Sequence, residues 1–116
     1  MPINAEDMLS VAEGLSESIN EAEIRASIGR SYYSAYHQGL EYFEMTDGRG
    51  FIGGSGGVHQ KLIDYFADNN HKAASYILAG LKAKRHLADY ELSATLSKED
   101  AQASVIYVKK FLEKLK

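Results

Sequence analysis

One long amphipathic segment, residues 20–45, constrains the fold of this chain more than any other feature. Apolar or small residues recur in it at spacings of three and four, the period of a helix with one buried face. These positions are Ile24, Ile28, Tyr32, Ala35, Gly39 and Phe43. The internal glycines Gly29 and Gly39 lower helix stability, so their presence requires compensation. We therefore expect one long helix on which the other segments pack, with the glycines allowing a neighbouring helix to approach closely.

Four further segments show a helical period, and no segment alternates as a strand does. Helices are predicted over residues 5–18, 58–67 and 72–92, and from residue 97 to near the end of the chain. The apolar stripe of the first is predicted to comprise Met8, Val11, Ala12, Leu15 and Ile19, and that of the 72–92 helix to reach Leu92. The chain is therefore predicted to be all-α, an antiparallel bundle of four main helices and one short helix.

Capping residues mark the starts of three of these helices. Asn4, Asn20 and Ser97 each have an acidic residue three positions later, which is the pattern of a capping box. Lysines gather near the end of the last helix, where the helix dipole favours positive charge.

A glycine-rich segment at about residues 46–57 interrupts the helical pattern. Gly48, Gly50 and Gly53 match G-x-G-x-x-G, the glycine fingerprint of dinucleotide-binding folds. That fingerprint needs a preceding strand within a βαβ unit, and here a helix precedes it. We interpret the match as accidental, the segment as a mobile loop, and residues 1–116 as one domain with no cofactor site.

The composition excludes several classes of protein. The chain has no cysteine, so it has neither disulfides nor zinc–thiolate sites. Its formal net charge of −3 argues against coating nucleic acid by bulk electrostatics, although basic side chains can still cluster on one face. No apolar run is long enough to span a membrane, and the first residues are acidic where a signal peptide is basic. We expect a cytoplasmic protein.

The long helix carries the first candidate site. Arg30 and His37 are seven residues apart, which places them about 20° apart around the helix axis, with Tyr33 and Ser34 between them. A histidine can take the proton from a ribose 2′-hydroxyl, and an arginine can stabilise charge on the phosphorus centre. This scheme needs no metal. The simpler interpretation is that both residues lie on the solvated face of an amphipathic helix.

The second candidate site is the run Arg85, His86, Asp89 and Tyr90. Arg85 falls within an apolar series, so it is expected to be paired, and Asp89 one turn later is the obvious partner. Such a pair can fix helix register, or it can hold the arginine toward a phosphate. His59 and His71 flank the short helix, but no spaced set of metal ligands accompanies them, and we expect no metal site.

Together these segments resemble the HEPN superfamily, most closely its small stand-alone branch. The resemblance covers nearly the whole chain and rests on R-S-Y-Y-S-A-Y-H from Arg30 to His37, a variable loop, a histidine at the start of a short helix, and R-x-x-A-D-Y from Arg85 to Tyr90. It implies a helical bundle that commonly forms a homodimer. Many members are metal-independent ribonucleases of toxin–antitoxin, phage-defence or RNA-processing systems, and others are inactive or partner small nucleotidyltransferases.

The match departs from the family pattern at one point. Active members have a histidine four to six residues after the arginine that Arg85 matches, and here Asp89, Tyr90 and Glu91 occupy those positions. Arg30 and His37 have a similar spacing, but in the earlier helix. The catalytic pair of the family is therefore not intact in this chain.

Three functional hypotheses follow. In the first, the chain acts on RNA or a nucleotide. Arg30 and Arg85 bind phosphate, His37 is the base, Tyr33 and Tyr90 supply hydroxyls, and Asp89 orients Arg85. In the second, it is a non-catalytic module that binds itself, an antitoxin or a nucleotidyltransferase. In the third, it is a helical adaptor, with Arg30 and Arg85 on separate surfaces and Arg85 merely ion-paired.

Overall fold

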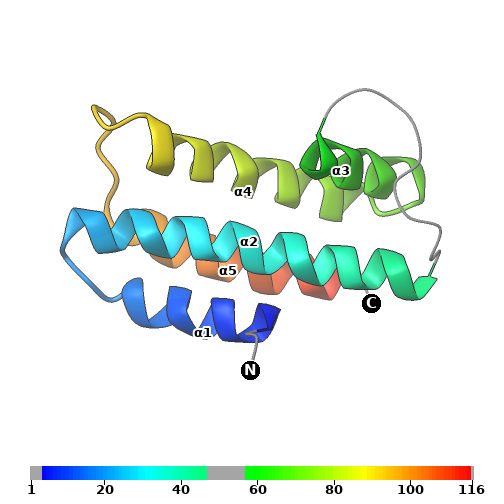
Figure 1. The fold of residues 1–116 in the computed structure, drawn as a ribbon, viewed down its shortest axis with the longest axis horizontal. Coiled ribbons are helices and arrows are strands. Elements are labelled where there is room, and N and C mark those ends of the chain that lie inside the picture. The colour runs from blue at the N-terminus through cyan, green and yellow to red at the C-terminus, as the bar shows by residue number, and fades with distance from the viewer. Residues whose placement is uncertain (1–3, 47–56, 116) are drawn as a thin grey trace.

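Five helices form where the apolar period predicts them. Figure 1 shows them in a computed structural model that describes residues 4–46 and 57–115. They are α1 (Ala5–Leu15), α2 (Glu21–Thr46), α3 (Val58–Asp68), α4 (Lys72–Tyr90) and α5 (Lys98–Lys114). No strand occurs in the described residues, so the all-α prediction is confirmed. The glycines of the predicted loop, except Gly57, lie outside the described residues.

The long helix α2 is the centre of the bundle. It contacts each of the other four helices, and Figure 1 shows α1, α4 and α5 running alongside it. Two buried serines of α2 hold α1: the Ser34 hydroxyl donates to the carbonyl of Ala5, and the Ser27 hydroxyl donates to that of Ala12, each at 2.7 Å. These two hydrogen bonds give the pair an antiparallel register.

Gly39 compensates for its helical cost by allowing close packing, as predicted. A Cβ atom at this position would lie 3.0 Å from Phe111 Cζ and 3.2 Å from Phe66 Cε2. Both phenylalanine rings are fully buried and belong to the main core, which joins α2, α3, α4 and α5. The glycine therefore lets α3 and α5 reach the α2 backbone at the same point.

The predicted N-caps are confirmed. Asn4 and Asp7 form a capping box at the start of α1, and Ser97 and Asp100 form another at the start of α5. The Asn20 side chain accepts a hydrogen bond from the Glu23 amide at 3.1 Å, which satisfies a free N–H in the first turn of α2.

The first helix is shorter than predicted. It ends at Leu15, after which the amides of Glu17 and Ser18 bond to carbonyls only three residues back and the chain turns toward α2. Ile19 then lies in the turn and is 90% exposed, so its assignment to the apolar stripe was wrong. Val11 is also exposed. The reason is that α1 faces α2 with Ala5 and Ala12, and Val11 does not lie on that face.

The fourth helix ends at Tyr90 rather than Leu92, and the reason is an arginine of α2. Arg25 donates five hydrogen bonds to backbone carbonyls at the end of α4 and in the turn that follows. The acceptors belong to Leu87, Ala88, Glu91, Leu92 and Ala94. These bonds hold the chain in a turn, and the Leu92 side chain, predicted to be buried, is 78% exposed.

None of the helices in the described ranges combines the length and the apolar character that crossing a membrane requires.

Candidate functional site

Three tyrosines and a histidine of α2 form one side of the candidate site. Tyr32 and Tyr36 lie one turn apart and are buried, while Tyr33 and His37, also one turn apart, are half-buried. The His37 ring lies 5.1 Å from the Tyr36 ring and 6.4 Å from the Tyr33 ring, measured between centroids. The doublet Tyr32–Tyr33 thus places one ring in the core and the next at its edge.

His59, the second residue of α3, closes this side of the site. Its ring stacks on Tyr36 with a centroid distance of 4.2 Å and lies edge-on to Tyr33 at 5.9 Å. Its Nδ1 atom shares a hydrogen bond with the Tyr32 hydroxyl. The two histidines, far apart in sequence, therefore contact the same pair of tyrosine rings.

Arg85 enters the site from α4. Its side chain is only 14% exposed, and its Cζ atom lies 5.5 Å from the ring centroids of both Tyr32 and Tyr33. Tyr90 lies on another side at 5.9 Å, and Nη1 reaches Asp89 Oδ2 at 3.4 Å. The Nε atom is buried, and it has no hydrogen-bond partner in the described part of the chain. We call Tyr32, Tyr33, Tyr36, His37, His59 and Arg85 the Arg85 cluster.

The environment of His59 favours its neutral form. Burial lowers the pKa of its imidazole, and the positive charges of Arg85 and Lys82 lower it further, with a smaller contribution from His37. Since the unperturbed pKa of histidine is about 6.5, the ring is uncharged at neutral pH and can accept a proton.

Tyr32, Tyr36 and Arg85 keep their ordinary protonation states at neutral pH. Burial raises the pKa of the Tyr32 hydroxyl, an effect that Arg85 reduces, and burial also raises that of Tyr36. Burial alone would lower the pKa of Arg85, but interactions with Tyr33 and Asp89 raise it overall. The cluster therefore holds one permanent positive charge beside neutral hydroxyls.

The structure brings together five of the six site residues predicted from the sequence. Arg85, Tyr33 and His37 belong to the cluster. Asp89 pairs with Arg85 as expected, and Tyr90 flanks the guanidinium and packs against His86 at 5.0 Å. The sixth residue stays apart.

Arg30 does not join the cluster. Its side chain is exposed, and no hydrogen bond, ion pair or ring contact links it to another residue within 4–46 and 57–115. It lies one turn before Tyr33 on the same helix, so its predicted position on the solvated face is correct.

Sequence reasoning missed Tyr32, Tyr36 and His59 as site residues. Tyr32 was assigned to the core stripe, which is correct, but its hydroxyl also reaches out to His59. His59 was considered as a metal ligand and as part of the family resemblance, but it was not assigned to the site. Its position at the start of a helix after a glycine-rich segment was the available signal, but only the packing of α3 on α2 shows what it contacts.

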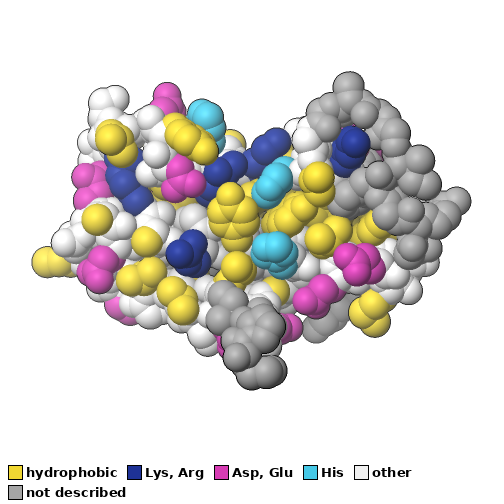
Figure 2. Space-filling model, viewed as in Figure 1, with side chains coloured by type: hydrophobic (Ala, Val, Ile, Leu, Met, Phe, Trp, Pro, Cys, Tyr) yellow, Lys and Arg dark blue, Asp and Glu magenta, His cyan; other side chains and the backbone are white. Residues whose placement is uncertain are grey.

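Figure 2 shows one face of the molecule, viewed as in Figure 1, with side chains coloured by type. Histidine and basic side chains gather near the middle of this face around hydrophobic ones. Two imidazoles and a guanidinium that can bind an anion lie in one region with the rings of half-buried Tyr33 and exposed Tyr90, which can stack on a base. Among the described residues, no group of three or more His, Cys, Asp and Glu could hold a metal ion.

Comparisons with known proteins give no relative for this arrangement: no family model, no curated protein and no solved structure matches the chain.

Proposed function

We propose that the chain is a metal-independent endoribonuclease of HEPN type, acting in a toxin–antitoxin or phage-defence system, with the Arg85 cluster as its active site. One observation carries this proposal: a mostly buried arginine with an unused N–H lies among tyrosines that also contact two histidines. A phosphate oxygen is the ligand that would complete the hydrogen bonding of this guanidinium.

Arg85 would bind the scissile phosphate and stabilise the charge that develops on it. Asp89 holds Nη1 from one side, which orients the guanidinium and leaves its other donors for the substrate. The rings of Tyr33 and Tyr90 flank the same group, and either can stack on a base next to the phosphate. Arg30, exposed one turn away, would contact a neighbouring phosphate.

The two histidines would divide the proton transfers. His59 is suited to act as the general base because its lowered pKa keeps the imidazole neutral. The sequence alone had suggested His37 for this role. His59 would take the proton from the 2′-hydroxyl as its oxygen bonds to phosphorus. His37, as imidazolium, would give a proton to the 5′-oxygen as the P–O5′ bond breaks. The products are a 2′,3′-cyclic phosphate and a 5′-hydroxyl, without water or metal.

The test is incubation of the purified protein with total RNA in EDTA, beside an Arg85→Ala/His37→Ala variant. We expect the wild type to produce fragments with cyclic phosphate ends and the double variant to lose this activity. Lys109→Ala is the matched control, because it removes a cation that pairs with Glu13 between α5 and α1, away from the cluster. Cleavage that survives in the double variant, or depends on added metal, would contradict the proposal.

A second candidate is a non-catalytic module that binds RNA, an antitoxin or a small nucleotidyltransferase, commonly as a homodimer. The observation that favours it is that His59 is already hydrogen-bonded to Tyr32, and Arg85 is already paired with Asp89. Groups held in this way bind a ligand without having to change protonation. Absence of cleavage, together with copurification of a partner that Arg85→Ala abolishes, would support this candidate over the nuclease.

A further inference from the structure

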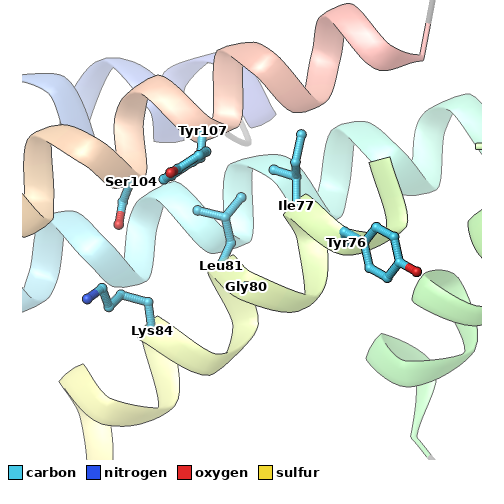
Figure 3. Close-up of a pocket in the computed structure, with 7 residues that line it drawn as sticks. All are labelled: Tyr76, Ile77, Gly80, Leu81, Lys84, Ser104 and Tyr107. Carbon is cyan, nitrogen blue, oxygen red and sulfur yellow. The ribbon is translucent and has the colours of Figure 1, made fainter. Parts of the chain in front are cut away.

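A second concave region lies between α4 and α5. It is a pocket of about 340 Å³, within the size range of small-molecule sites. Figure 3 shows Ile77 and Leu81 of α4 opposite Tyr107 of α5, with Lys84 at one end and Tyr76 at the other. Tyr76 and Tyr107 are 71% and 48% exposed, so two large rings stand unpacked at the rim.

Gly80 is the residue that keeps this pocket open. It lies in the middle of α4, where a glycine costs about 1 kcal/mol relative to alanine. A Cβ atom at Gly80 would meet nothing within 4 Å, whereas one at Gly39 would meet Phe111 at 3.0 Å. Packing therefore explains Gly39 but not Gly80. What Gly80 provides is space on the pocket wall, since any side chain there would project into it.

A lysine and a serine line the polar part of the pocket. Lys84 lines the pocket and pairs with Asp100 at 3.1 Å, and Lys110 lies 5.6 Å from the centre of the Tyr107 ring. The Asp100 carboxylate is shared, because it also accepts hydrogen bonds from Ser97. Ser104 lines the pocket as well, and its hydroxyl makes no hydrogen bond to any described residue. The pocket thus combines an apolar surface with a hydroxyl that has no partner among the described residues and a lysine whose carboxylate partner is shared.

We propose that this pocket binds a small amphipathic carboxylate, with an aromatic body on Ile77 and Leu81 between the tyrosine rings. The carboxylate pairs with Lys84 and accepts a hydrogen bond from Ser104. The site is independent of the Arg85 cluster, because it lies between α4 and α5, whereas Arg85 packs against α2. Its existence does not require the chain to be a nuclease.

The test is titration of isotope-labelled protein with naphthylacetate, followed by NMR amide shifts. Gly80→Met fills the pocket wall while improving helix propensity, so it should weaken binding at least about tenfold without unfolding the chain. Gly14→Met is the matched control: Gly14 also lies in a helix with open space around it, but outside this pocket. It should bind naphthylacetate as the wild type does.

The charge requirement is tested separately. Lys84→Gln, and the neutral analogue naphthylacetamide with the wild type, should each weaken binding roughly fivefold, as expected for one partly exposed ion pair. Shifts should map to residues 76–84 and 104–107. Binding that is absent in the wild type, unchanged in Gly80→Met, or equal for acid and amide would overturn the proposal.

Discussion

Two arginines of this bundle are almost equally buried, and their surroundings differ completely. The Arg25 side chain is 12% exposed and that of Arg85 is 14% exposed. Arg25 donates five hydrogen bonds to the backbone at the end of α4. Arg85 makes one long hydrogen bond to Asp89, and its buried Nε has no partner among the described residues.

The difference separates a structural arginine from a candidate functional one. Arg25 satisfies carbonyls that the end of a helix leaves free, so its role is complete within the chain. Arg85 is surrounded by three tyrosine rings, whose faces attract a cation. A buried donor without a partner costs stability, and a ligand that accepts a hydrogen bond from it would offset this cost, which is why we propose a functional role for Arg85.

The largest expected effect concerns Arg25. Arg25→Met should lower the free energy of unfolding by about 3 kcal/mol, because five backbone carbonyls, three of them in partly buried hydrogen bonds, lose this donor at once. Urea denaturation followed by circular dichroism measures this. Lys109→Met, which removes an exposed ion pair with Glu13, should cost less than about 0.5 kcal/mol. Equal losses of stability in the two variants would show that Arg25 does not have the structural role assigned to it.

The next effect is the pH dependence of stability that is due to His59, a member of the Arg85 cluster. Because the folded chain holds the pKa of His59 below its ordinary value, the unfolded chain binds that proton more readily. The stability that neutral His59 contributes is present above about pH 6.5 and is lost as the pH falls toward its folded pKa.

This is measured by urea denaturation between about pH 8 and about pH 5, a range above most carboxylate titrations. The wild type should lose stability on acidification, and His59→Gln should lose less. A steeper loss in His59→Gln would contradict the assigned environment of His59.

The smallest effect concerns Gly29, which lies on α2 one turn after Arg25 and faces Asp89, the partner of Arg85. A Cβ atom there would lie 3.8 Å from Asp89 Oδ1, an ordinary contact. Gly29→Ala should therefore stabilise the chain by about 0.5–1 kcal/mol through helix propensity and leave the Arg85–Asp89 pair in place. Thermal denaturation measures the gain. A loss of stability would mean that Asp89 has less room than the geometry indicates.

Local sequence signals predict much of this fold. The apolar period gives all five helices, and Asn4, Asn20 and Ser97 give three helix starts. Helix ends are less predictable because long-range contacts determine them. The end of α4 depends on Arg25, more than sixty residues earlier in the sequence. No residue near Tyr90 predicts that the helix ends there.

The candidate site is predictable only where one helix contains it. Tyr33 and His37 share a helical face, and Arg85 and Asp89 are one turn apart, so spacing identifies both pairs. His59 contributes through the packing of α3 on α2, which helical periodicity does not encode. The pocket beside Gly80 was missed for the same reason, because its walls come from two helices.

The most direct test of the central claim, that Arg85 is a functional rather than a structural arginine, is the Arg85→Met variant with stability and RNA cleavage in EDTA measured on one preparation. We expect an unfolding free energy within about 1 kcal/mol of the wild type, since methionine keeps the apolar contacts and removes an unsatisfied donor. Cleavage should fall at least about a hundredfold. A loss of stability as large as that of Arg25→Met, with wild-type cleavage in the fraction that remains folded, would contradict it.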